Sequence, residues 1–171
     1  IVAPEYGWDD YKGLDVKGKV LVMMNNDPED DPALFGGRTR LYYGRWDYKY
    51  EIAAAKGAIG AIIIHTTPSA GYGFSVVQNS WSGELFALAG GTGPRVQVKM
   101  WTTEDASRKI ATLAGQDLTA LTAKAQKKDF KPVPLGVTMS MALNNEVKKK
   151  ASANVIGKWP GSDPKLKDEA I

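Results

Sequence analysis

Residues 46–65, which read WDYKYEIAAAKGAIGAIIIH, decide the fold of this chain. From position 43 to position 57, aromatic residues, alanines and a glycine recur at spacings of three and four, which predicts a helix. Gly57 is suited to end that helix because glycine adopts the left-handed conformation of a C-cap at little cost. We expect an aromatic stripe of the helix to face the core, made of Tyr43, Trp46 and Tyr50. The charged residues of the segment fall on its other faces: Arg45, Asp47, Lys49 and Glu51.

An apolar run lies on each side of this helix. Residues 20–24 read VLVMM and residues 58–64 read AIGAIII. Unbroken apolar runs of this length are typical of strands that are buried on both faces. A strand, a crossover helix and a second strand form a βαβ unit, so we expect the two strands to be parallel.

Further elements are predicted after this unit. Polar and apolar residues alternate over residues 95–100, which indicates a half-exposed strand. Thr103 is suited to cap a helix that runs through about residue 114, and Asp117 a helix that runs through about residue 128. The alternation from Val137 to Val147 predicts another strand, and residues 154–157 predict a short one.

Residues 65–94 are rich in glycine and aromatic residues, and we expect them to form a long loop. Loops of this length inside a compact domain are usually functional or poorly ordered. Large rings next to amide side chains are typical of binding surfaces. Two interpretations stay open, because the rings can either bind a ligand or cover the loop's own core. The candidate substrate-binding residues are Tyr72, Phe74, Gln78, Asn79 and Trp81.

The composition excludes several kinds of site. The 171 residues contain no cysteine and one histidine, so disulfides, thiolate metal sites and cysteine nucleophiles are excluded. The formal charge of +3 is a mild excess. A nucleic-acid-binding protein is expected to cluster basic residues and aromatic residues on one face. The sequence shows no such cluster, so we expect no nucleic-acid partner. No apolar stretch reaches the ~18 residues that a membrane span needs.

Two further features receive a structural interpretation. His65 follows the apolar run 58–64, and we expect it to be a locally hydrogen-bonded residue at a strand end. A metal-ligand or acid–base role is disfavoured because the chain has no second histidine and no cysteine to assist it. The acidic residues after the first apolar run lack the spacing of a calcium loop, so we expect a solvated turn. These residues are Asp27, Glu29, Asp30 and Asp31.

Several stretches, taken in order, resemble the protease-associated domain of the M28 family of zinc aminopeptidases. Residues 16–22 (VKGKVLV) and 48–63 (YKYEIAAAKGAIGAII) are similar to the strand, alanine-rich helix and strand of such domains. Residues 3–11 (APEYGWDDY) and 75–83 (SVVQNSWSG) are similar to stretches of this domain in that family. Residues 154–162 (NVIGKWPGS) resemble the start of the peptidase domain.

The resemblance implies an α/β (α+β) fold, namely a protease-associated mixed β-sandwich or open barrel with flanking helices. It implies that residues 1–150 form this domain and that residues 151–171 begin a truncated peptidase domain. Both ends of the chain are expected to be interior positions of a longer protein, periplasmic or secreted. That parent is expected to be a metallopeptidase, a hydrolase whose two zinc ions are held by the missing peptidase domain.

One histidine cannot assemble the two-histidine dizinc site of that family. We therefore expect no catalytic residue, metal ion or cofactor in this chain. The resemblance implies an accessory role in proteolysis, as a lid or substrate-guiding module over the active site of the chain's own peptidase domain. The expected partners are that domain in cis and a peptide substrate. The alternative is a structural or protein–protein interaction module that stabilises the peptidase domain.

Overall fold

The computed structural model describes residues 1–166 and residue 169. The chain divides into two compact units, Ile1–Thr138 and Met139–Ile171. All helices and strands of the described residues lie in the first unit. The expected division of the chain after residue 150 stays a prediction.

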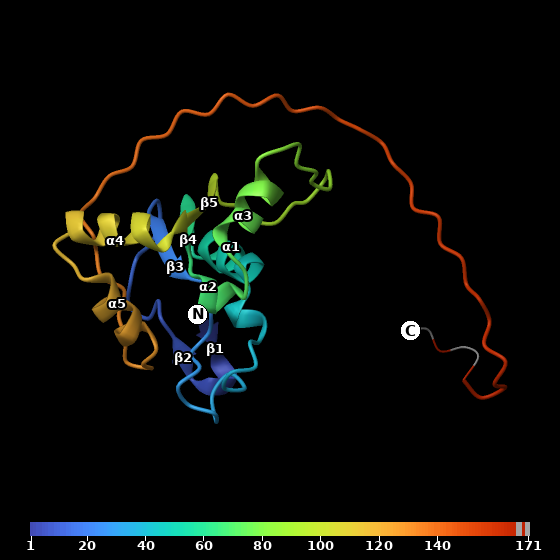
Figure 1. The fold of residues 1–171 in the computed structure, drawn as a ribbon, viewed down its shortest axis with the longest axis horizontal. Coiled ribbons are helices and arrows are strands. Elements are labelled where there is room, and N and C mark those ends of the chain that lie inside the picture. Colours follow the sequence, from blue (N-terminus) through green and yellow to red (C-terminus); the bar gives the residue numbers. More distant parts are fainter. Residues whose placement is uncertain (167–168, 170–171) are drawn as a thin grey trace. The chain divides into compact units, whose positions relative to one another are not determined.

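A three-stranded parallel sheet forms the centre of the first unit, in the order β3-β4-β5 (Figure 1). The strands are β3 (Val20–Met24), β4 (Gly60–His65) and β5 (Val98–Thr103). The short 3-10 helix η2 (Tyr42–Gly44) and the helix α1 (Trp46–Ala55) cross between β3 and β4. The predicted βαβ unit with parallel strands is therefore confirmed. All six residues of β4 are buried, whereas β3 is only half-buried because it lies at an edge of the sheet.

The capping signals are confirmed at both helices that follow β5. The Thr103 hydroxyl accepts a hydrogen bond from a backbone N–H three residues on, at 3.2 Å, and α4 (Glu104–Leu113) begins there. The Asp117 carboxylate does the same at 2.7 Å for α5 (Leu118–Ala125). The second helix ends earlier than the sequence predicts.

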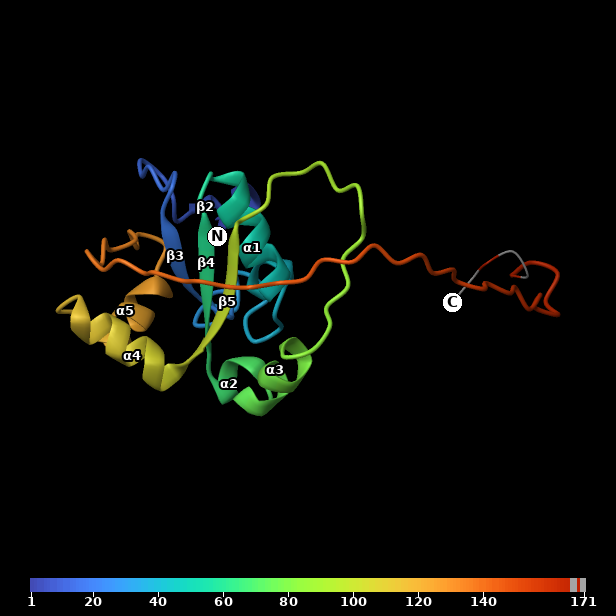
Figure 2. The ribbon, with the colours of Figure 1, turned by 90° about the horizontal axis from the view of Figure 1, so that it is seen from above.

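Helices cover both faces of the sheet (Figure 2). On one face, Ile63 of β4 packs in a cluster with Tyr50 of α1. On the other face, Ile64 packs with Ala111 of α4 and Leu118 of α5. Successive side chains of a strand point to opposite faces, so the single apolar run of β4 supplies both layers of the core.

A second apolar cluster joins the N-terminal hairpin to α1. The Phe35 ring is fully buried between Tyr6, at 4.6 Å between ring centroids, and Trp8, at 5.2 Å. The predicted aromatic stripe is divided between the two clusters, because Tyr43 packs here while Trp46 and Tyr50 pack against the sheet. The hairpin consists of β1 (Val2–Ala3), η1 (Pro4–Tyr6) and β2 (Trp8–Asp9).

Residues 65–94 differ from the expected long loop, because two helices interrupt them. The Thr66 side chain accepts a hydrogen bond from Ser69 N at 3.2 Å and caps α2 (Thr67–Ala70). After Gly71 and Tyr72, the helix α3 (Phe74–Trp81) follows. Packing explains α3, since it buries Val77 although no side chain caps its start.

The strands predicted at Val137 to Val147 and at 154–157 are wrong. Residues 131–161 form no helix or strand, and Ile156 is 91% exposed. Alternating residues become a strand only when a neighbouring strand supplies hydrogen-bond partners, and none lies beside these segments within the described residues. The fold is of the mixed α+β class, with no closed barrel among the described strands. A sandwich or open barrel of the protease-associated type stays a prediction.

Candidate functional site

The candidate site is built on the carboxyl end of β4. The strand ends at His65, and Thr66 turns the chain into α2. Gly71, with a φ of 80°, ends α2 in the left-handed conformation that glycine tolerates. This turn places Tyr72 between the two short helices, directly over the end of the sheet.

An open cleft of about 300 Å³ lies between α3, the start of α1 and β5. Tyr72 and Trp81, which the sequence singled out, both line this cleft, and Trp81 is 42% exposed. The Trp81 ring meets the Trp46 ring edge to face, with 5.5 Å between centroids. We call this hollow the aromatic cleft, and its main lining residues are Trp46, Tyr72, Val76, Val77, Trp81 and Trp101.

The other three candidate residues lie outside the cleft lining. Phe74 is half-buried, and its ring lies 5.5 Å from the His65 ring. Gln78 and Asn79 are exposed on α3 and do not line the cleft. The structure therefore divides the aromatic residues of this segment, since Phe74 packs internally while Trp81 lines an open hollow.

His65 lies under the aromatic cleft rather than in it. Its side chain is 3% exposed, and its ring lies 5.5 Å from Tyr72 and 6.1 Å from Trp101. Nε2 of His65 and Nε1 of Trp101 are buried without a hydrogen-bond partner. The expected local hydrogen bond is thus absent at Nε2, and ring contacts hold His65 in place. An unpaired buried polar atom costs about 1–3 kcal/mol of stability.

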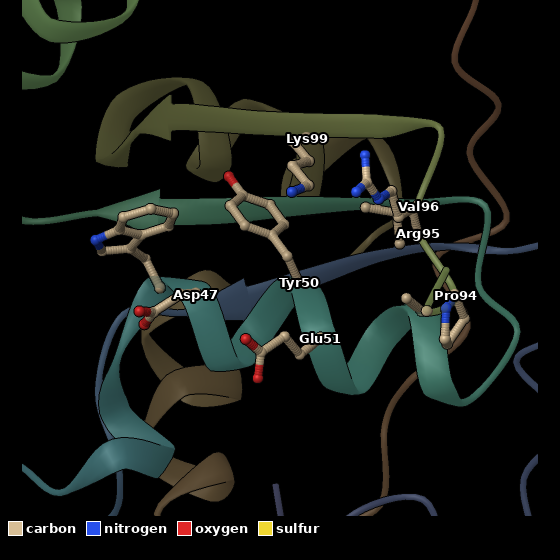
Figure 3. A pocket seen from close by; sticks show the side chains of 10 residues that line it. Asp47, Tyr50, Glu51, Pro94, Arg95, Val96 and Lys99 are labelled. Atoms are coloured by element: carbon tan, nitrogen blue, oxygen red, sulfur yellow. The ribbon is translucent and has the colours of Figure 1, made fainter. Parts of the chain in front are cut away.

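A second hollow, of about 310 Å³, lies beside α1 (Figure 3). The acidic side chains of Asp47 and Glu51 come from α1, whereas Arg95 and Lys99 come from the segment that leads into β5 and from β5 itself. The Tyr50 ring lies between these two sets, with Lys99 Nζ 5.3 Å from its centroid. We call this hollow the charged pocket. Trp46 lines it and also lines the aromatic cleft.

The acidic groups of the charged pocket have partners of their own. Asp47 forms an ion pair with Arg45 at 3.1 Å. The Tyr42 hydroxyl donates a hydrogen bond to Glu51 Oε2, which raises the pKa of Tyr42 to about 12 because the bond favours the protonated hydroxyl. Within the described residues, no ion pair includes Arg95 or Lys99.

The helix α1 contains a buried cation that its sequence pattern does not reveal. Lys49, expected on an outer face, is only 5% exposed, and its Nζ donates a hydrogen bond to Asn26 O at 2.8 Å. Burial lowers the pKa of Lys49 to about 8, although nearby Asp10 and Asp27 oppose the shift. The alternation of charged and apolar residues cannot reveal that Lys49 is buried, because the carbonyl that accepts its hydrogen bond belongs to a distant residue, Asn26.

The acidic turn after β3 is likewise only partly solvated. Asp27 is buried, and burial raises the pKa of its carboxyl although its Oδ2 accepts a hydrogen bond from Leu41 N at 2.9 Å. Glu29, Asp30 and Asp31 are exposed as expected. Neither Lys49 nor Asp27 lines the aromatic cleft or the charged pocket, so both belong to the framework of the fold. Over the described part of the chain, no group of three or more metal-ligating side chains gathers.

No family model, curated protein or solved structure matches this chain. Among the described residues, no helix is both long and apolar enough to cross a membrane. The aromatic cleft and the charged pocket are therefore the structural basis for assigning a function, together with the resemblance noted in the sequence.

Proposed function

We propose that this chain is a non-catalytic, peptide-binding accessory domain of the protease-associated type, belonging to a secreted or periplasmic zinc aminopeptidase of the M28 family. The observation that carries the proposal is the aromatic cleft, in which Tyr72 and Trp81 stay partly exposed around a hollow of about 300 Å³. Large rings left open to solvent around a concavity are typical of ligand-binding sites.

The position of the cleft supports the same proposal. Ligands of parallel sheets bind beyond the carboxyl ends of the strands, and α2 and α3 follow the carboxyl end of β4. A volume near the lower end of the range for ligand pockets suits one large apolar side chain rather than a whole peptide. The domain therefore holds one residue of a peptide by its side chain.

The role in the parent enzyme follows from this binding. An apolar side chain held between Trp81 and Tyr72 fixes the orientation of the peptide backbone beside it. The zinc ions of the peptidase domain supply the hydrolytic chemistry, while this chain guides the substrate and covers the active site. Fixing a reacting group in a productive orientation lowers the entropic cost of the reaction, so the effect is expected in selectivity between peptides.

The test uses the 171-residue chain and blocked tripeptides that differ only by phenylalanine or alanine at one position. We expect the phenylalanine peptide to bind at least tenfold more tightly, measured by calorimetry and by tryptophan fluorescence, because three tryptophans line the cleft. Trp81→Ala is expected to abolish this preference. Trp159→Ala is the matched control, since Trp159 is 95% exposed in the other unit. Equal binding of the two peptides would falsify the proposal.

The alternative, a module that stabilises the peptidase domain, has a separate observation in its favour. Val155, Ile156 and Trp159 expose almost their whole side chains. Exposed apolar side chains close together in the sequence are typical of surfaces that another domain covers. In the full-length enzyme, this role predicts that Trp159→Ser lowers the melting temperature without changing the ranking of peptide substrates.

A further inference from the structure

We propose that the aromatic cleft and the charged pocket form one continuous groove, which recognises a large apolar side chain next to a carboxylate. This inference rests on the proposed function and adds the chemistry of the preferred peptide. The carboxylate belongs to the residue that fills the aromatic cleft, when that residue ends the peptide, or to an acidic neighbour.

The continuity of the groove depends on Trp46 at the start of α1. This side chain lines both hollows. Its ring meets Trp81 of the aromatic cleft at 5.5 Å and Tyr50 of the charged pocket at 6.2 Å, both edge to face. The two hollows are therefore adjacent and share the Trp46 indole in their lining. Because neighbouring residues of an extended peptide lie about 3.3–3.6 Å apart, two groups on either side of one ring belong to the same residue or to near neighbours.

The charges of the groove favour an anion on the β5 side. Lys99 and Arg95 lie there, and neither takes part in an ion pair within the described residues. Lys99 Nζ lies over the Tyr50 ring, a contact that orients the amine without neutralising its charge. The two cations are therefore available to a ligand.

The acids on the opposite wall do not cancel this preference. Glu51 accepts the Tyr42 hydroxyl, and Asp47 is paired with Arg45. Two carboxylates and two cations line the pocket, and Arg45, the ion-pair partner of Asp47, adds a third cation. The formal net charge of these five groups is +1. Figure 3 shows that Asp47 and Glu51 project from α1, whereas Arg95 and Lys99 come from the β5 side. We therefore expect a ligand carboxylate to bind on the β5 side of the pocket. Charge-assisted hydrogen bonds to a carboxylate are roughly twice as strong as neutral ones.

The experiment compares pairs of blocked peptides on the 171-residue chain by calorimetry. One pair is Ac-Ala-Ala-Phe with a free or an amidated C-terminus, which tests a terminal carboxylate. The other is amidated Ac-Ala-Phe-Asp and Ac-Ala-Phe-Asn, which tests a side-chain carboxylate. We expect the acid of at least one pair to bind about tenfold more tightly than its neutral form, and this ratio to fall as salt rises.

Variants identify the residues responsible. Lys99→Gln and Arg95→Gln are each expected to remove most of the acid-to-neutral ratio, while Lys99→Arg keeps it and Lys109→Gln, an exposed change on α4, leaves it unchanged. Arg95 is exposed and precedes β5, so its variant tests the groove even where changes at Lys99 disturb the strand. Equal binding of acid and neutral forms in both pairs overturns the inference while the proposed function stands. Failure of every phenylalanine peptide to bind overturns the proposed function, and the inference with it.

Discussion

Replacing Lys49 with methionine is expected to remove a pH-dependent penalty from the fold. Burial lowers the pKa of Lys49 from 10.5 to about 8. At about 1.36 kcal/mol per pKa unit, keeping this amine charged costs the folded chain about 3 kcal/mol. Loss of the hydrogen bond to Asn26 O offsets much of the gain at neutral pH, because such bonds from charged donors contribute about 1.5–3 kcal/mol.

The pH dependence of the free energy of unfolding tests the burial of Lys49 more directly than the stability at a single pH. Below about pH 8 the folded and unfolded chains both hold the lysine proton, so the cost is fully present. Between about pH 8 and pH 10.5 the folded chain has released the proton and the unfolded chain keeps it, so stability rises with pH. From about pH 7 to pH 9.5 the native chain should gain roughly 2 kcal/mol relative to Lys49→Met.

Urea unfolding at these two pH values, followed by tryptophan fluorescence, measures that difference. The comparison with the variant cancels the contributions of groups whose pKa does not depend on Lys49, which include the buried tyrosines. The N-terminal amine is not among them, because the charge of Lys49 helps to lower its pKa. Lys109→Met, a change of an exposed lysine, is the control and should show the same pH dependence as the native chain. If the stabilities of Lys49→Met and of the native chain change in parallel with pH, the Lys49 amine is not desolvated in the folded chain, which would refute the expected pH dependence.

Two further predictions concern packing around β4. His65→Phe keeps the contacts with Tyr72 and Phe74 but removes the unpaired Nε2, so thermal unfolding should show no loss of stability or a gain of about 1–2 kcal/mol. A loss above about 1 kcal/mol would mean that Nε2 has a hydrogen-bond partner in solution. Gly60→Ala would place a Cβ 3.1 Å from Val98 Cβ and 3.3 Å from Val20 Cγ2, so it should cost about 1–3 kcal/mol. Gly83→Ala, where a Cβ meets nothing within 4 Å, is the control, and an equal effect of the two changes would refute the close approach of the strands.

Where the structure-forming interactions are local, the sequence was sufficient. The apolar runs of β3 and β4, the periodicity of α1 and the caps Thr103 and Asp117 depend on residues within a few positions of one another. The parallel pairing of β3 and β4 followed from the intervening helix, because a crossover connection allows little else. Composition alone also singled out Tyr72 and Trp81, both of which line the aromatic cleft.

Tertiary structure decided whatever depends on a distant partner. The alternating residues 137–147 form no strand, because no neighbouring strand pairs with them among the described residues. In contrast, α3 forms without a capping side chain because Val77 is buried in the core. Lys49 is buried because the chain after β3 brings a carbonyl to its amine. The groove joins Trp46 of α1 to Trp101 and Lys99 of β5, which are neighbours only once the sheet has formed. Periodicity reports which side of an element is apolar, but long-range pairing determines what that side meets.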